Sequence, residues 1–121
     1  MNLHSLDAAA FLHLHLEALG KDESACDGEK LTAALAYPLG LAMSGDADVA
    51  AIAAAYAVGM LRHQPFFSAN EQAAFLALGA FLYLNTWRLD ASQEEATQAM
   101  RMLASAELDE DGLANWIRQR L

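Results

Sequence analysis

The chain has 121 residues, of which 55% are hydrophobic and 19% are charged. A chain of this length forms one domain with a single core, and the composition excludes a disordered or fibrous protein. The formal net charge is −9 at pH 7, and the few basic residues are scattered along the chain. Binding of nucleic acid, which needs clustered Lys and Arg, is therefore not expected.

Cysteine content and hydropathy indicate the compartment. Cys26 is the only cysteine, so no disulfide can form within the chain. The first residues lack the positive charge of a secretory signal, and the longest apolar runs are shorter than the ~20 residues that span a bilayer. These features predict a cytoplasmic protein without a membrane partner.

Helix caps and breakers predict a single all-α domain over residues 1–121, a compact bundle of five or six helices. The cap signals are Asp27, the Ser92–Glu95 pair, Asp46 or Asp48 for the third helix, and Asp109 or Asp111 for the last. Pro38 is expected to end the second helix, because proline disfavours helical backbone in the residue before it. We expect helices from 5 or 7 to about 19, with Gly20 as its stop, and over about 29–37, 46 or 48 to 64, 69–85, 92–106 and 112–121.

The first expected helix carries apolar residues and two histidines. Leu6, Ala10, Phe11 and Leu14 are expected to face inward. His13 and His15 stand two residues apart, so on a helix they point about 200° apart and cannot share a metal. We expect both histidines to be exposed or half-buried.

The segment 62–72, Arg-His-Gln-Pro-Phe-Phe-Ser-Ala-Asn-Glu-Gln, joins two helices. Pro65 ends the first, and Ser68 with Glu71 forms a capping-box signature for the second. The run 73–84 is apolar on every face, which predicts that the helix of about 69–85 is buried at the centre of the bundle. Small residues around Gly59 would form its seat.

This segment and its flanks resemble the signature of the Fic/Doc (Fido) superfamily, in particular death-on-curing (Doc) proteins. That signature reads His-Pro-Phe-x-Asp/Glu-Gly/Ala-Asn-Gly/Lys-Arg before a buried helix. Pro65, Phe66, Ala69 and Asn70 match it, and Phe66 is expected to pack inward. The remaining positions differ: Gln64 replaces the catalytic His, Ser68 the metal-binding carboxylate, and Glu71 and Gln72 the Lys-Arg pair of Doc-type proteins.

The resemblance implies transfer of a phosphoryl or adenylyl group from a nucleotide to a protein hydroxyl. Such transfer needs a base, Mg²⁺ and donors for the phosphate charge. Gln64 cannot act as a base, Ser68 cannot anchor Mg²⁺ alone, and Glu71 places a negative charge where the phosphate would bind. We therefore expect no catalytic residue, metal or cofactor, and only weak nucleotide binding by Ser68, Ala69 and Asn70.

A catalytically degenerate protein, a pseudoenzyme that binds a protein partner, is the preferred interpretation. Tyr37, Pro38 and Phe67 are the candidate contact residues, because Tyr37 and Pro38 match the flap that holds a target chain in the family. Doc-type proteins pair with small antitoxins, so a remnant of a toxin–antitoxin system with an antitoxin-like peptide partner is a natural variant.

Two other interpretations stay open. The first is an active transferase that uses Mg·ATP and replaces the missing base with His63. The second is a structural or oligomerising helical domain, because the high apolar content is compatible with a homodimer.

Overall fold

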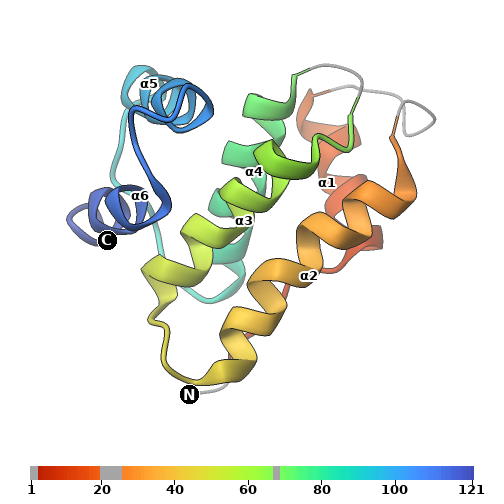
Figure 1. Cartoon of the computed structure of the whole chain (residues 1–121), viewed down its shortest axis with the longest axis horizontal. Coiled ribbons are helices and arrows are strands. Elements are labelled where there is room, and N and C mark those ends of the chain that lie inside the picture. The colour runs from red at the N-terminus through yellow and green to blue at the C-terminus, as the bar shows by residue number, and fades with distance from the viewer. Residues whose placement is uncertain (1–2, 20–25, 67–68) are drawn as a thin grey trace.

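The computed structural model describes residues 3–19, 26–66 and 69–121 of the chain (Figure 1). These residues contain six α-helices: α1 (Ala8–Leu19), α2 (Gly28–Ser44), α3 (Val49–His63), α4 (Asn70–Leu84), α5 (Gln93–Ala104) and α6 (Glu110–Arg118). No strand occurs within those three ranges, where the only β-type pairing is an isolated antiparallel bridge between Cys26 and Phe66. The expected all-α class is confirmed.

Helices α3 and α4 lie in the middle of the molecule, between the pair α1 and α2 and the pair α5 and α6 (Figure 1). Almost every residue of α3 from Val49 to Met60 is buried. The helix expected at the centre, 69–85, is present as α4, but its burial is one-sided: Tyr83 is 83% exposed and Leu84 is 44% exposed. The helix that the others enclose is α3.

Helix starts follow the local cap signals. The side chains of Asp27, Asp48 and Asp109 accept hydrogen bonds from backbone N–H groups in the first turns of α2, α3 and α6. Ser92 and Glu95 form the expected capping box of α5, with both reciprocal hydrogen bonds present. These caps satisfy N–H groups that have no partner within the helix.

Helix α2 corrects the expected role of Pro38, because it continues through the proline to Ser44. A proline inside a helix cannot donate to the carbonyl four residues earlier, here that of Ala34. Gly59 of α3 packs against this carbonyl oxygen so closely that a methyl group on Gly59 would overlap it. Gly59 thus lies against the carbonyl that Pro38 leaves without its helical donor. Gly59 therefore packs against α2.

The inward face of α1 also differs from the expectation. Phe11 and His15 are fully buried, whereas Ala10 is exposed. His15 was expected to be at least partly exposed, but it lies on the face that α1 presents to Phe66. His13 is exposed as expected, and its Nε2 lies 3.0 Å from a carboxylate oxygen of Glu17.

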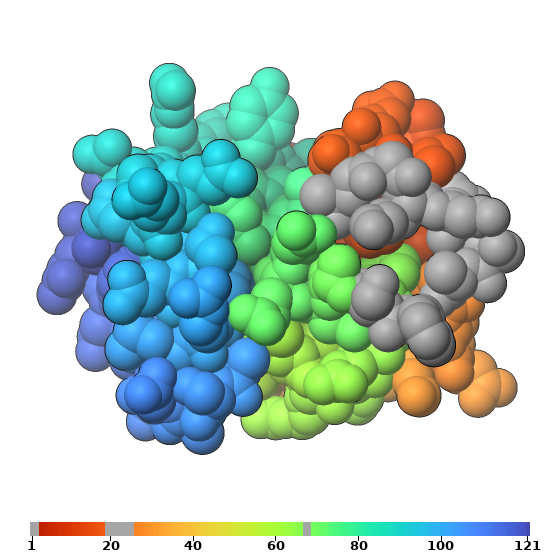
Figure 2. All heavy atoms as spheres, turned by 90° about the horizontal axis from the view of Figure 1, so that it is seen from above, coloured from red at the N-terminus to blue at the C-terminus, as the bar shows by residue number. Residues whose placement is uncertain are grey.

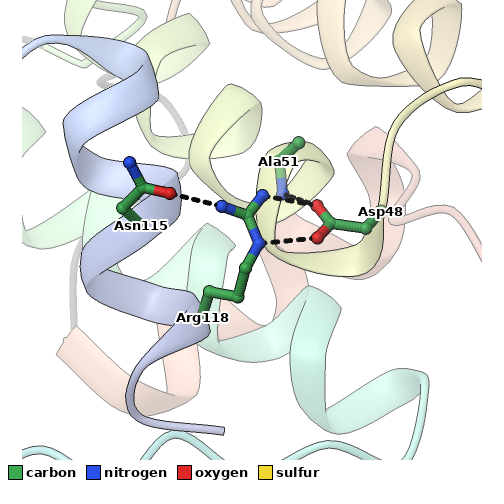
Figure 3. A network of polar contacts seen from close by, with 4 residues as sticks. All are labelled: Asp48, Ala51, Asn115 and Arg118. Atoms are coloured by element: carbon green, nitrogen blue, oxygen red, sulfur yellow. Dashed lines mark hydrogen bonds and ion pairs between the residues drawn. The ribbon is translucent and has the colours of Figure 1, made fainter.

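Helix α6 is attached to the start of α3 by an ion pair (Figure 3). Arg118 donates from Nε to Oδ2 of Asp48 at 2.7 Å and from Nη2 to Oδ1 at 2.9 Å. The same Oδ1 accepts the N–H of Ala51 at 2.9 Å, so Asp48 caps α3 and binds α6 together. The Arg118 guanidinium holds the pKa of Asp48 below its ordinary value.

Among the helices that the structure describes, none is long and apolar enough to cross a bilayer.

Replacing Gly59 by Ala should destabilise the protein strongly, because the added methyl group overlaps the backbone of Ala34, which cannot move without shifting α2. We expect a loss of about 2–4 kcal/mol in the free energy of unfolding, measured by urea denaturation. Gly40→Ala is the matched control: Gly40 is an exposed helical glycine with open space around it, so alanine should be neutral or stabilising by up to about 1 kcal/mol. Equal effects of the two changes would contradict the close contact.

The ion pair predicts a pH-dependent contribution to stability. Because the pKa of Asp48 is lower in the folded protein, the folded state resists protonation more than the unfolded chain does. The stabilisation is therefore complete above the unfolded pKa of about 3.9 and is lost as the pH falls through the lower, folded value. At pH 7, Arg118→Gln should lower the free energy of unfolding by up to about 1 kcal/mol, a small amount because both side chains are half-exposed.

Urea denaturation at pH 7 and near pH 3 measures this dependence, and the effect of Arg118→Gln should shrink at the lower pH. Arg88→Gln, at an exposed position after α4, is the charge-matched control. An equal loss in both variants, or a loss from Arg118→Gln that does not depend on pH, would show that the pair with Asp48 is not responsible.

Candidate functional site

The loop between α3 and α4 is the candidate site, and it begins at Gln64. Gln64 ends α3 in the left-handed conformation, with φ 47° and ψ 62°, and its N–H donates to the carbonyl of Met60 at 2.9 Å. Left-handed backbone ends a helix and turns the chain away from the helix axis. Gln64 is thus an exposed helix terminus that turns the chain towards the buried Pro65.

Backbone contacts attach the next part of the loop to the start of α2. The N–H of Asp27 donates to the carbonyl of Pro65 at 2.7 Å, and Cys26 pairs with Phe66 in the isolated bridge. Asp27 is also the cap of α2. These backbone contacts therefore hold the start of α2 against the loop that follows α3.

The side chain of Phe66 fixes the loop to α1. Phe66 is buried, and its ring stacks on that of His15 with a centroid separation of 4.1 Å and an interplanar angle of 7°. Phe11 lies beside both rings, 6.1 Å from Phe66. Phe66 is a core residue as expected, and it joins α1 to the candidate site.

Asn70, the first residue of α4, closes the loop. Its Oδ1 accepts the N–H of Phe66 at 3.1 Å, and its Nδ2 donates to the carbonyl of Phe66 at 2.9 Å. The side-chain amide thus pairs with one backbone residue as a strand would. Asn70, which the sequence predicted to bind a nucleotide weakly, therefore uses both of its side-chain polar atoms to hold the loop.

The N-cap residue of α4 is Ala69, which has φ 61° and ψ 35° and whose side chain, a methyl group, makes no cap hydrogen bond. Ser68 and Phe67 lie outside the described residues, so the capping box of Ser68 with Glu71 and the partner contact of Phe67 stay predictions. Glu71 is exposed in the first turn of α4, where unpaired N–H groups favour negative charge.

A hollow beside the loop is lined from α3, α4 and α5, by Leu61, Gln64, Ala69, Asn70, Glu71, Gln72, Thr97 and Ala104. Among these residues Glu71 carries the only charge. The guanidinium of Arg62 lies over the ring of Tyr37, 5.5 Å from its centroid. His63 follows as the last residue of α3 and is half-buried. The hollow therefore carries a negative charge at the start of α4.

Tyr37 and Pro38, the residues expected at a flap, both lie within α2. The hydroxyl of Tyr37 donates to the two carboxylate oxygens of Glu110, at 2.7 and 2.8 Å, and this hydrogen bond raises the pKa of Tyr37. Pro38 is buried, and in this position a partner cannot reach it. Tyr37 is partly exposed and joins α2 to α6.

An apolar groove lies between α1, α4 and α5, and it was not predicted from the sequence. Leu14 of α1, Thr97 of α5 and the α4 residues Phe75, Leu76 and Tyr83 line it. Figure 2 shows α4, in green, between the red-orange of α1 and the cyan-blue of α5. The available signal was the uniform apolarity of α4, which exceeds what one buried face requires.

In the part of the chain that the structure describes, no three His, Cys, Asp or Glu side chains gather as a group that could hold a metal ion. No family model and no curated protein matches the chain. The resemblance to the Fic/Doc superfamily therefore rests on the loop and its flanking segments.

The loop geometry predicts that Asn70 is a structural residue. Asn70→Ala removes both hydrogen bonds to Phe66, and we expect a loss of about 1–3 kcal/mol in the free energy of unfolding. Asn70→Asp should be less damaging, because a carboxylate still accepts from the N–H of Phe66 but cannot donate to its carbonyl. Gln98→Ala, which removes an exposed amide on α5, is the control. Thermal or urea unfolding measures all three, and an unchanged Asn70→Ala variant would refute the clamp.

Proposed function

We propose that this chain is a catalytically degenerate Fic/Doc-like domain that binds a protein partner and no longer transfers a nucleotide-derived group. The single observation that carries the proposal is the charge of the hollow at the start of α4. Among the described residues that line the hollow, the charged one is Glu71. Its carboxylate stands in the first turn of α4, where the free N–H groups of a helix start would otherwise favour a phosphate.

Electrostatics make this arrangement unfavourable for a nucleotide. A carboxylate about 5 Å from a phosphate costs roughly 3 kcal/mol per pair of unit charges at an effective dielectric constant of 20. That cost corresponds to about a hundredfold in affinity. Arg62 does not offset it, because its guanidinium lies against Tyr37.

The other loop residues support the same proposal. Asn70 is committed to the backbone of Phe66, and Gln64 is a helix terminus with a side chain that cannot accept a proton at neutral pH. Because these loop residues have structural roles, we assign the protein a role in binding a partner and not in catalysis. A remnant of a toxin–antitoxin system, acting in the cytoplasm on an antitoxin-like peptide, is the setting that the resemblance favours.

Calorimetric titration with Mg·ATP up to millimolar concentration tests this proposal. The natural protein should give no binding heat, whereas Glu71→Ala should bind, because it removes the competing charge from the hollow. Glu29→Ala is the matched control, since Glu29 holds the equivalent first-turn position in α2. A variant with Gln64→His, Ser68→Asp, Glu71→Lys and Gln72→Arg should bind more tightly still.

Binding by the natural protein at micromolar concentration would overturn the proposal. So would phosphoryl or adenylyl transfer to a protein that is lost in His63→Ala, because that result would establish an active transferase. Circular dichroism of each variant verifies that the fold is intact.

A further inference from the structure

The segment 3–6, which precedes α1, is held on the bundle by hydrogen bonds to its backbone. The N–H of His4 donates to Oδ1 of Asn85 at 2.6 Å, and Nδ2 of Asn85 donates to the carbonyl of His4 at 2.9 Å. The N–H of Leu6 donates to the hydroxyl of Tyr56 at 2.9 Å. These three hydrogen bonds use backbone groups of the segment, so they do not depend on which side chains the segment carries.

The same hydrogen bonds select an extended conformation. The N–H and C=O of one residue point to the same side when the backbone is extended, as in the hydrogen-bonded pairs of an antiparallel sheet. His4 and Leu6, two residues apart, both donate to the bundle, and this is the period of an extended chain. Asn85 therefore takes the place of a neighbouring strand. Asn70 binds the backbone of Phe66 in the same way at the other end of α4.

One side chain of the segment enters the core. Leu6 is 7% exposed, whereas His4 is exposed. When a protein binds an extended peptide, hydrogen bonds to the main chain supply affinity and side-chain pockets supply specificity. The surface formed by Asn85, Tyr56 and the apolar pocket of Leu6 has both features. We refer to this surface as the Asn85–Tyr56 slot.

Phe81 of α4 orients both polar residues of the Asn85–Tyr56 slot. Nδ2 of Asn85 also donates to the carbonyl of Phe81 at 2.9 Å, and the ring of Tyr56 packs on that of Phe81 with a centroid separation of 4.8 Å. Neither contact involves the segment 3–6. A site whose groups are already oriented loses little conformational freedom when its ligand binds. We therefore expect the slot to keep its shape when the segment leaves.

The segment is separable from the helix that follows it. Asp7 caps α1: its Oδ1 accepts the N–H of Ala10 at 2.7 Å, and its carbonyl accepts the N–H of Phe11 at 2.9 Å. Phe11 is fully buried and anchors α1 to the core. Helix α1 thus has its own cap and its own anchor. Because a segment with few buried contacts opens at a lower free energy than the core does, the segment 3–6 is able to leave while α1 stays.

We infer that the Asn85–Tyr56 slot is a binding site for an extended peptide, and that the chain's own residues 3–6 occupy it as a tethered ligand. The slot recognises the backbone of one residue and an apolar side chain two positions later. A partner that presents such an extended segment competes with residues 3–6. The inference goes beyond the proposed function and does not rest on it, because Asn85 ends α4 whereas the loop hollow lies at its start.

Titration of the full-chain variant Leu6→Ser with the free peptide Leu-His-Ser-Leu-Asp, which has the sequence of residues 3–7 and blocked ends, tests this inference. The substitution weakens the hold of the tethered segment, so the slot becomes open to the peptide. NMR titration should give a Kd of about 1 mM for the variant. The natural protein should bind at least about tenfold more weakly, because its own segment occupies the slot. Equal binding by the two proteins, or no binding by the variant, would overturn the inference.

Methylation of the peptide backbone tests how the peptide is recognised. A methyl group on the amide nitrogen of His4 removes the donor to Asn85, so affinity for the Leu6→Ser variant should fall at least about fivefold. The same methyl group on Ser5 is the matched control, because successive N–H groups of an extended chain point to opposite sides. Equal loss from the two modifications would refute recognition of an extended backbone.

Substitutions in the slot place the peptide within the molecule. Added to the Leu6→Ser variant, Asn85→Ala and Tyr56→Phe each remove one hydrogen-bonding group, and each should weaken the peptide at least about fivefold. Gln98→Ala, which removes an exposed amide on α5, is the control. An affinity that none of the three changes alters, or that all three lower equally, would show that the peptide binds elsewhere.

Native-state hydrogen exchange of the natural protein gives a second test, which does not depend on the folding of any variant. The N–H groups of His4 and Leu6 should exchange together, at least about a hundredfold faster than the N–H groups in the middle of α3. Exchange of Leu6 as slow as that of α3 would show that the segment is a fixed part of the core and would overturn the inference. So would a natural protein that sediments as a dimer and becomes monomeric in Asn85→Ala, because the segment of a second copy would then fill the slot.

Discussion

The close contact between Gly59 and the carbonyl of Ala34 is the constraint on which the rest of the bundle depends. It lets α3 approach α2 closely at the place where Pro38 has removed a helical hydrogen bond. With α2 this near, α3 is enclosed by α2, α4 and α6. The fold thus uses a glycine in one helix and a proline in another as a matched pair.

The loop after α3 is held by contacts from three directions. Asp27 binds it from α2, the ring of His15 packs on Phe66 from α1, and Asn70 pairs with its backbone from α4. Pro65, Phe66 and Asn70 therefore have structural roles that do not depend on any group transfer.

How well the sequence predicted each feature depended on whether its cause was local. The caps at Asp27 and Ser92 were found because capping needs only residues within one turn, and Asp48 and Asp109 were each one of two neighbouring candidates. Pro38 was misjudged because the group that packs against the carbonyl it leaves without a donor is Gly59, a residue distant in sequence. His15 was misjudged because α1 is apolar on several faces, so the pattern does not select one. The groove was missed because apolarity identifies a face able to pack but not whether a neighbour covers it.

The stacking of Phe66 on His15 has a consequence for motion. Helix α1 forms one wall of the groove, and the same helix carries His15 and Phe11, which close over Phe66 of the loop. Local opening in proteins occurs in cooperative units that share their buried contacts. Detachment of α1 would widen the groove and uncover the loop in one event. A ligand that clamps α1 against α4 would therefore slow solvent access to the loop, so that two surfaces on different sides of α1 share one opening equilibrium.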